Sequence, residues 1–135
     1  MMRRRRTTAL LGAAMTIVCL TAGAVPAVAA KPGMTVKIPA RQDVDNVYVL
    51  AAIHQKKCTM QVTGSVMGHR FRTFRKSKIT IHLTNQGFLR LSSSAKKSVK
   101  KAIRRGKTVK AKITVTARNS SGERNSVTRS VTLKD

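Results

Sequence analysis

The stretch Val109-Lys-Ala-Lys-Ile-Thr-Val-Thr-Ala-Arg118 alternates apolar and polar side chains from its first residue to its last. Strict alternation is typical of a β-strand that turns one face to a core and the other to solvent. Its Val, Ala and Ile side chains are therefore expected to face inward, and its Lys, Thr and Arg side chains outward. The following Asn119-Ser-Ser-Gly122 predicts a hairpin loop in which Gly122, and also Asn119, can take a positive φ.

A returning strand follows this loop, with Val127, Val131 and Leu133 as its inward residues. Arg129 shares their parity, although it is charged. An inward-pointing charge near a sheet edge is a known guard against the addition of further strands. The two long strands therefore predict a hairpin whose second member lies at or near an edge.

Shorter extended segments precede the hairpin and are separated by turn residues. A strand over residues 34–38 ends at Pro39, residues 47–53 are apolar on both parities, and residues 58–66 alternate again with Cys58 on the apolar side. A strand of the second sheet is expected at about 70–74, after a turn at Gly68. Further extended runs are expected at 79–83 and 88–91. Asp43 to Asn46 and Asn85-Gln-Gly87 are interpreted as turns.

One segment has the period of a helix instead. Ser92, Ser93 or Ser94 can cap its start and Gly106 its end. Between them an apolar stripe is formed by Ala95, Val99, Ala102 and Ile103. We therefore predict a mainly β chain, an antiparallel β-sandwich with one short basic amphipathic crossover helix at about 93–105.

The same segments resemble a recurring Ig-like module of exported proteins from high-GC Gram-positive bacteria. The resemblance covers roughly residues 58–134. It rests on the runs 58–64, 89–95, 107–118, 121–122 and 127–133. It implies an Ig-like β-sandwich used as a stalk, spacer or binding module at the cell envelope, with no activity attached. The chain departs from the pattern at Glu123, where Asn is common, and it has no second cysteine near Cys58 for a disulfide.

Residues 1–30 have the composition of a signal peptide. Arg3 to Arg6 form a positive start, residues 9–25 carry no charge, and Ala27-Val-Ala-Ala30 supplies small residues for cleavage after Ala29 or Ala30. The alternatives are a retained membrane anchor and, for the route, twin-arginine export. We expect a secreted or cell-wall-associated protein whose single mature domain spans residues 31–135.

The charge of the expected mature chain is extreme. Without the four arginines of the signal peptide, 24 of the 28 Lys and Arg residues remain against four acids, a net charge of +20. Such a surface attracts polyanions over its whole extent. The charges are spread among alternating apolar residues, so the segment is not expected to be disordered.

The residues needed for catalysis or metal binding are few. Cys58, His54, His69 and His82 are the whole supply of nitrogen and sulfur ligands in the expected mature chain, and Cys58 lies on the apolar parity, where a core role is favoured over a reactive one. Of the four acids, Asp43 and Asp45 share one turn, Glu123 lies in another and Asp135 is at the end of the sequence, so no pair is placed to flank a bond. The sequence therefore predicts a protein that is not an enzyme, with no catalytic residue, metal or cofactor.

Two basic clusters are the candidate binding residues. The helix presents six cations, and a segment that alternates basic and aromatic residues adds four more. The alternatives are a solvated helix face and, for Phe71 and Phe74, places in the core together with Tyr48 and Phe88. The predicted polyanion-binding residues are Lys96, Lys97, Lys100, Lys101, Arg104 and Arg105, followed by Arg70, Arg72, Arg75 and Lys76.

These features predict a non-catalytic domain that contacts anionic polymers such as wall polymers, acidic glycans, phospholipid headgroups or nucleic acid. One alternative is a membrane-active cationic protein whose helix lies in a lipid interface. Against it, the apolar stripe contains no Trp, Phe or Leu. Another alternative is a passive spacer without a ligand.

Overall fold

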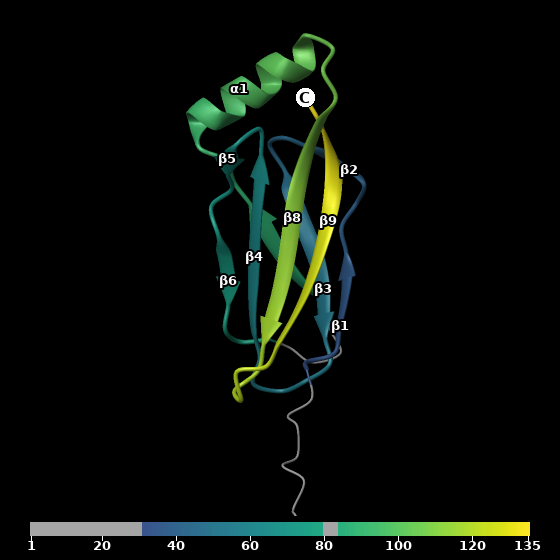
Figure 1. Ribbon diagram of the computed structural model, residues 1–135, viewed down its shortest axis with the longest axis vertical. Helices are drawn as coiled ribbons and strands as arrows, with labels where there is room; N and C mark the ends of the chain where they lie inside the picture. The colour runs from purple at the N-terminus through teal and green to yellow at the C-terminus, as the bar shows by residue number, and fades with distance from the viewer. Residues whose placement is uncertain (1–30, 80–83) are drawn as a thin grey trace, which may run out of the picture.

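The computed structural model describes residues 31–79 and 84–135, which form two packed β-sheets and one helix (Figure 1). The smaller sheet has three antiparallel strands in the order β1-β3-β7. Their bounds are Met34–Lys37 for β1, Val47–Ile53 for β3 and Thr84–Leu89 for β7. The chain is therefore mainly β, as the alternating pattern predicts.

The larger sheet has six strands in the order β2-β9-β8-β4-β5, with β6 also paired to β4. Its centre is the predicted hairpin of β8 and β9, in which Val115 lies opposite Val127. The bounds are Arg41–Asp43 for β2, Thr59–Val66 for β4, His69–Arg70 for β5, Phe74–Lys76 for β6, Val109–Arg118 for β8 and Arg124–Lys134 for β9.

The strand order is that of an Ig-like sandwich. An Ig domain places its strands A, B and E in one sheet and C, F and G in the other. Here β1, β3 and β7 occupy the A, B and E positions, while β4, β8 and β9 occupy C, F and G. The short β2 pairs parallel to β9 at the edge of the larger sheet. Residues 34–43 thus contribute one strand to each sheet, β1 to the smaller and β2 to the larger.

The core lies between the sheets and follows the predicted parities. The inward side chains of β3, β4 and β8 are buried, and so is Cys58, which is 2% exposed. The outward side chains of the same strands are exposed or half-buried. The largest fully buried residues include Ile53, Met60 and Ile113. Burial of these apolar side chains is the main stabilising contribution to the fold.

The helix α1, Ser93–Arg104, connects the two sheets and covers one end of the sandwich (Figure 1). The Ser92 hydroxyl accepts a hydrogen bond from the Ala95 N–H at 3.3 Å, which caps its start. Gly106, with a φ of 80°, ends it, and the Lys107 N–H donates to the Ala102 carbonyl. Ala95, Val99 and Ala102 are buried. The prediction of this helix is confirmed.

The predicted turn at Asn85-Gln-Gly87 is wrong, because these residues belong to strand β7. Gly87 lies opposite Val49 on β3 and is buried. A Cβ atom at Gly87 would lie 3.0 Å from Cδ1 of the Phe74 ring. The glycine therefore allows a close approach between a backbone and an aromatic ring inside the sandwich, which sequence patterns do not distinguish from a turn.

The segment predicted as one strand of the second sheet at 70–74 is instead two short strands, β5 and β6. Both pair with β4, so they extend the larger sheet, which already contains β4. Between them Phe71 enters the core, and Arg72 forms an isolated bridge with Arg90. Of the predicted strand at 79–83, residues 80–83 lie outside the described residues.

Arg129 lies at a sheet edge with the inward parity, opposite the buried Ile113, and it is exposed because β2 pairs with β9 only at Thr132 to Lys134. Two other single-residue expectations need correction. Phe88 is 47% exposed on the outer side of the smaller sheet, where it contacts Tyr48. In the hairpin loop Gly122 takes a positive φ and Asn119 does not.

Candidate anion-binding surface

The six helix cations are divided into two rows by the geometry of α1. The inner row, Lys96, Lys100 and Arg104, forms ion pairs with two aspartates that are distant in sequence. Lys96 and Lys100 contact Asp45 at 3.0 and 2.5 Å. Lys100 and Arg104 contact Asp135 at 3.2 and 2.6 Å. Half of the predicted helix cluster, three cations, is therefore ion-paired with two carboxylates of the fold.

Asp45 is held in place by the turn between β2 and β3. The Gln42 side chain is buried, and its amide accepts from the Tyr48 N–H at 2.7 Å and donates to the Tyr48 carbonyl at 2.9 Å. The Asp43 carboxylate accepts a hydrogen bond from the Asp45 N–H. These bonds fix a short turn whose exposed tip carries Asp45 beneath the inner row of the helix.

The ion pairs change the proton affinity of both aspartates. Hydrogen bonds from Lys100 and Lys96 hold the pKa of Asp45 below its usual value. Arg104 and Lys100 lower the pKa of Asp135 in the same way, and these two carboxylates raise the pKa of Lys100. The causes are direct contacts with the opposite charge at the surface. The inner row thus fastens the helix to the body of the domain.

The outer row consists of Lys97, Lys101 and Arg105, all exposed. None of the ion pairs among residues 31–79 and 84–135 includes them. Lys97 and Lys101, and likewise Lys101 and Arg105, are four residues apart, so their charges repel on one helix face. These three residues are the part of the predicted helix cluster that forms none of the described ion pairs, although Arg104 of the inner row is also exposed at the surface.

A second set of cations lies on the outward face of the larger sheet. Directly opposed residues of an antiparallel pair share a face. One row of this face joins Arg70 on β5, Ser65 on β4 and Lys112 on β8. A second row joins Arg75, Gln61, Thr116 and Ser126, and a third joins Thr59, Arg118 and Arg124. Between the first and second rows lie Thr63, Thr114 and Thr128.

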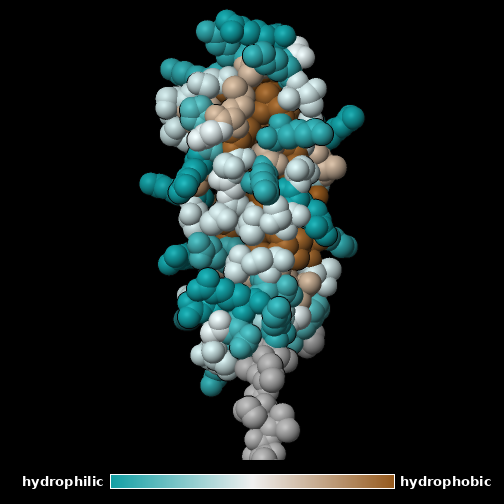
Figure 2. All heavy atoms as spheres, in the orientation of Figure 1, coloured by the Kyte–Doolittle hydropathy of each residue, from teal (hydrophilic) through white to brown (hydrophobic). Residues whose placement is uncertain are grey.

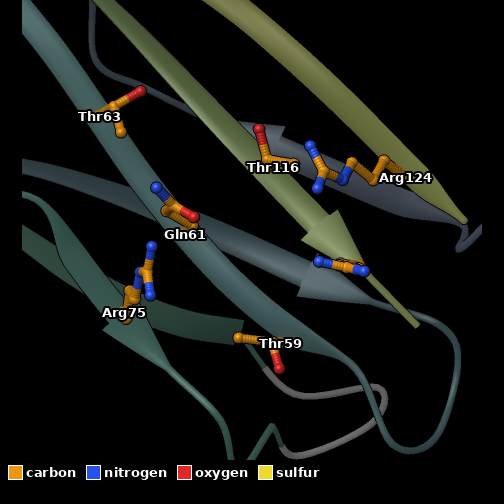
Figure 3. A pocket seen from close by; sticks show the side chains of 7 residues that line it. Thr59, Gln61, Thr63, Arg75, Thr116 and Arg124 are labelled. Carbon is orange, nitrogen blue, oxygen red and sulfur yellow. The ribbon is translucent and has the colours of Figure 1, made fainter. Parts of the chain in front are cut away.

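The second and third rows surround a shallow hollow of about 370 Å³ at the end of the sheet that is farthest from the helix. Arg75 lies beside Gln61, and Arg124 extends from β9 toward Thr116 on β8 (Figure 3). The hollow is lined by Thr59, Gln61, Thr63, Arg75, Thr116, Arg118 and Arg124. Guanidinium groups with neighbouring hydroxyl and amide groups are suited to oxyanions, because they donate several hydrogen bonds in fixed directions.

No acidic residue balances these cations within their strands. β4, β5, β6, β8 and β9 contain no Asp or Glu. In Figure 2 side chains of intermediate hydropathy, drawn in white, run along the middle of this face, and strongly hydrophilic side chains project at its margins. The sheet face therefore combines a hydroxyl-rich centre with positive charges that form no ion pair among residues 31–79 and 84–135, and these charges attract anions over one Debye length, about 8–10 Å.

The predicted second cluster is only partly assembled by the structure. Arg70 and Arg75 lie on the outward sheet face described above. Arg72 lies in the bridge to Arg90, and Lys76 is half-buried on the same parity as Met60. Phe71 is buried and Phe74 is half-buried against the core, so the aromatic residues between these cations serve packing.

Sequence reasoning missed Lys112, Arg118 and Arg124 as members of the site. Their outward parity is readable from the alternation, but their proximity to Arg70 and Arg75 depends on the pairing of β4 with three other strands. The hairpin loop is the one local signal that could have identified part of the site. Once the register of the hairpin is known, Arg118 and Arg124 on either side of the loop lie opposite each other.

The Cys58 thiol lies away from this surface. It is buried beside the core strands, and its sulfur contacts the Lys56 carbonyl at 3.7 Å. Burial raises its pKa, which disfavours the thiolate form that nucleophilic chemistry requires. Among residues 31–79 and 84–135, no group of three or more His, Cys, Asp and Glu side chains is arranged to hold a metal ion.

Comparison with models of protein families, with curated proteins and with solved structures found no match to this chain. Over the described parts of the chain, no helix combines the length and the apolar character needed to cross a bilayer.

Proposed function

We propose that this chain is an exported, non-catalytic protein whose mature domain binds anionic polymers at or outside the cell envelope. One observation carries the proposal: five cations, Arg70, Arg75, Lys112, Arg118 and Arg124, share a sheet face, and the strands that carry them, together with β4, contain no acid. The outer helix row adds a second, smaller basic surface. Export rests on the signal-peptide composition of residues 1–30.

Binding would proceed mainly by charge matching. A polymeric anion that docks on the sheet face releases its condensed counterions, so its affinity falls steeply with salt. The like charges on the face also repel one another, and a bound anion relieves that repulsion. Both effects favour association at low ionic strength and give modest selectivity among polyanions of similar charge density.

The membrane-active alternative is disfavoured by the position of α1. Its apolar residues Ala95, Val99 and Ala102 are already buried against the sandwich. Its inner row is held by Asp45 and Asp135. A helix that entered a lipid interface would have to break both sets of contacts, and it would offer only small apolar side chains in return. We therefore prefer polymer binding to membrane insertion.

The test is chromatography of the mature domain on immobilised heparin with a salt gradient. We expect retention at low salt, and the variant Arg75→Gln/Arg118→Gln/Arg124→Gln should elute at clearly lower salt. In solution the slope of log affinity against log salt should fall by about one for each anionic group of the polymer that is no longer neutralised. The matched control is Lys37→Gln/Lys78→Gln/Lys107→Gln, which removes equal charge from lysines elsewhere on the surface.

Two results would contradict the proposal. One is a wild-type domain that fails to bind heparin, polyphosphate and nucleic acid even in dilute buffer, as a passive spacer would. The other is an equal effect of the sheet-face variant and the control variant, which would mean that net charge alone decides retention. Leakage from anionic vesicles would favour the membrane-active alternative.

A further inference from the structure

The cations of the sheet face form two separate clusters along one strand. The hairpin-end cluster is Arg75, Arg118 and Arg124. The helix-end cluster is Arg70 and Lys112, which flank Ser65 from both sides. The helix-end row crosses β4 at Ser65, whereas the rows of the hairpin-end cluster cross it at Gln61 and Thr59. Four to six residues of an extended strand correspond to about 13–20 Å. Positive charge is therefore concentrated at two points of a line parallel to β4.

A strip of hydroxyl groups fills the space between the two clusters. Thr63, Thr114 and Thr128 form one row across β4, β8 and β9. The Thr114 and Thr128 hydroxyls hydrogen-bond to each other at 2.9 Å, as do those of Thr116 and Ser126. A hydroxyl has one donor and two acceptor positions, so each pair keeps capacity for a ligand. The strip offers hydrogen bonds to a neutral polar group.

The two clusters and the strip form a continuous surface. A second shallow hollow, also of about 370 Å³, is lined by Arg70, Lys112, Ser65 and Thr114. It shares Thr63 with the hollow that contains the hairpin-end cluster. A linear ligand can therefore lie along β4 and contact both clusters without leaving the sheet.

The aromatic residues do not present an exposed ring to this surface. Phe71 borders the second hollow but is buried in the core, Phe74 is half-buried against the core, and Tyr48 and Phe88 lie on the smaller sheet. Proteins that bind single-stranded nucleic acid without sequence preference stack bases on exposed aromatic rings. Here the space between the two cation clusters holds the hydroxyl groups of Thr63, Thr114 and Thr128 instead of aromatic rings. Its chemistry favours sugar or polyol units over nucleobases.

We propose that this surface binds a linear anionic polymer with hydroxyl-bearing units, an acidic glycan or a polyol phosphate, extended along β4 with one anionic group at each cluster. This inference rests on the proposed polyanion binding and adds the class of polymer and its direction. Because the two clusters act on one chain, the second contact is intramolecular once the first has formed. Affinity should therefore rise sharply when an oligomer becomes long enough to reach both clusters.

The experiment measures affinity by calorimetry for oligomers of increasing length. Heparin oligosaccharides represent the glycan, poly(glycerol phosphate) the polyol phosphate, and oligothymidylate of equal charge the nucleic acid. We expect a step of about tenfold or more at the spanning length for the first or second polymer. The variants Arg70→Gln/Lys112→Gln and Arg75→Gln/Arg118→Gln/Arg124→Gln should each abolish the step while short oligomers still bind the remaining cluster.

The hydroxyl strip is tested separately with Thr63→Val/Thr114→Val/Thr128→Val, which keeps β-branched side chains and the same charge. This variant should bind the preferred hydroxyl-bearing polymer about three- to tenfold more weakly. Its affinity for inorganic polyphosphate, which has the charge but no hydroxyl-bearing units, should not change. Thermal unfolding of each variant shows that the domain remains folded.

The inference is overturned if affinity grows smoothly with length, if either cluster variant keeps the step, or if oligothymidylate binds as tightly as both other polymers. If the threonine variant weakens the binding of polyphosphate as much as that of the hydroxyl-bearing polymer, the hydroxyl strip does not contact the ligand specifically. These results differ from a failure of the proposed function, in which the wild-type domain binds none of the polymers at any length.

Discussion

Arg118 and Arg124 lie directly opposite each other across the β8–β9 ladder, on the solvent side of the sheet. Like charges at such a position destabilise a pair of strands. No ion pair among residues 31–79 and 84–135 involves either arginine. The pair therefore has a local cost in stability within the hairpin-end cluster, which is expected where a site serves binding.

Arg118→Thr should raise the free energy of unfolding by about 0.5 kcal/mol at low salt, because it removes the repulsion and places a good strand former in β8. The gain should shrink as salt screens the charges. Urea unfolding at two salt concentrations measures this, and heparin retention should fall in the same variant. Arg129→Thr is the control, because Arg129 lies opposite Ile113. An unchanged or lower stability of Arg118→Thr would contradict the prediction.

The two helix rows should respond differently to neutralisation. Lys97→Gln/Lys101→Gln/Arg105→Gln should weaken heparin retention and leave the thermal midpoint unchanged or slightly higher, since these like charges repel one another. Lys96→Gln/Lys100→Gln/Arg104→Gln should lower the midpoint, because it removes the ion pairs to Asp45 and Asp135. Equal midpoints for both variants would show that the inner row does not fasten the helix.

Acid should weaken the attachment of the helix. The pKa values of Asp45 and Asp135 are lowered by their cationic partners. Their stabilising contribution is therefore complete above the usual value of 3.8 and is lost as pH falls through the lowered values. Urea midpoints measured from pH 6 to pH 2 should fall at the acid end. Asp45→Asn/Asp135→Asn should show a smaller fall.

The same aspartate variant also tests the masking of the inner row at neutral pH. Without the two carboxylates, the charges of Lys96, Lys100 and Arg104 become more available to a polyanion. Asp45→Asn/Asp135→Asn should therefore elute from heparin at higher salt than the wild type. Asp43→Asn is the single-charge control, because Asp43 forms none of the described ion pairs and an asparagine oxygen can still accept the Asp45 N–H. If the double aspartate variant elutes at the same salt concentration as the wild type, the two aspartates do not reduce polyanion binding by the inner row.

Gly87→Ala should destabilise the domain by about 1–3 kcal/mol, because its Cβ would lie 3.0 Å from the Phe74 ring. Gly33→Ala is the control, since a Cβ there meets His54 at an ordinary 3.5 Å. Phe74→Leu should recover part of the loss in a double-mutant cycle, because it removes the ring that the new methyl group meets. Additive losses would show that the ring is not the cause.

The sequence by itself determined which faces of the strands and of the helix are buried. Alternation in the long hairpin and in residues 58–66 specified which side chains enter the core, since a strand has a side-chain period of two. The helix was equally readable, because Ser92 and Gly106 mark ends that local hydrogen bonds require. Local patterns failed at Gly87, where the need for a glycine comes from Phe74, a residue of another strand.

Only the tertiary structure decided which cations remain available to a ligand. Lys100 and Asp45 are 55 residues apart, and no local pattern indicates that they meet. Arg75, Arg118 and Arg124 come from three strands and become neighbours through the pairing registers of β4, β8 and β9. Parity is a property of one strand and is written in the sequence, whereas register and strand order follow from packing the whole chain at once.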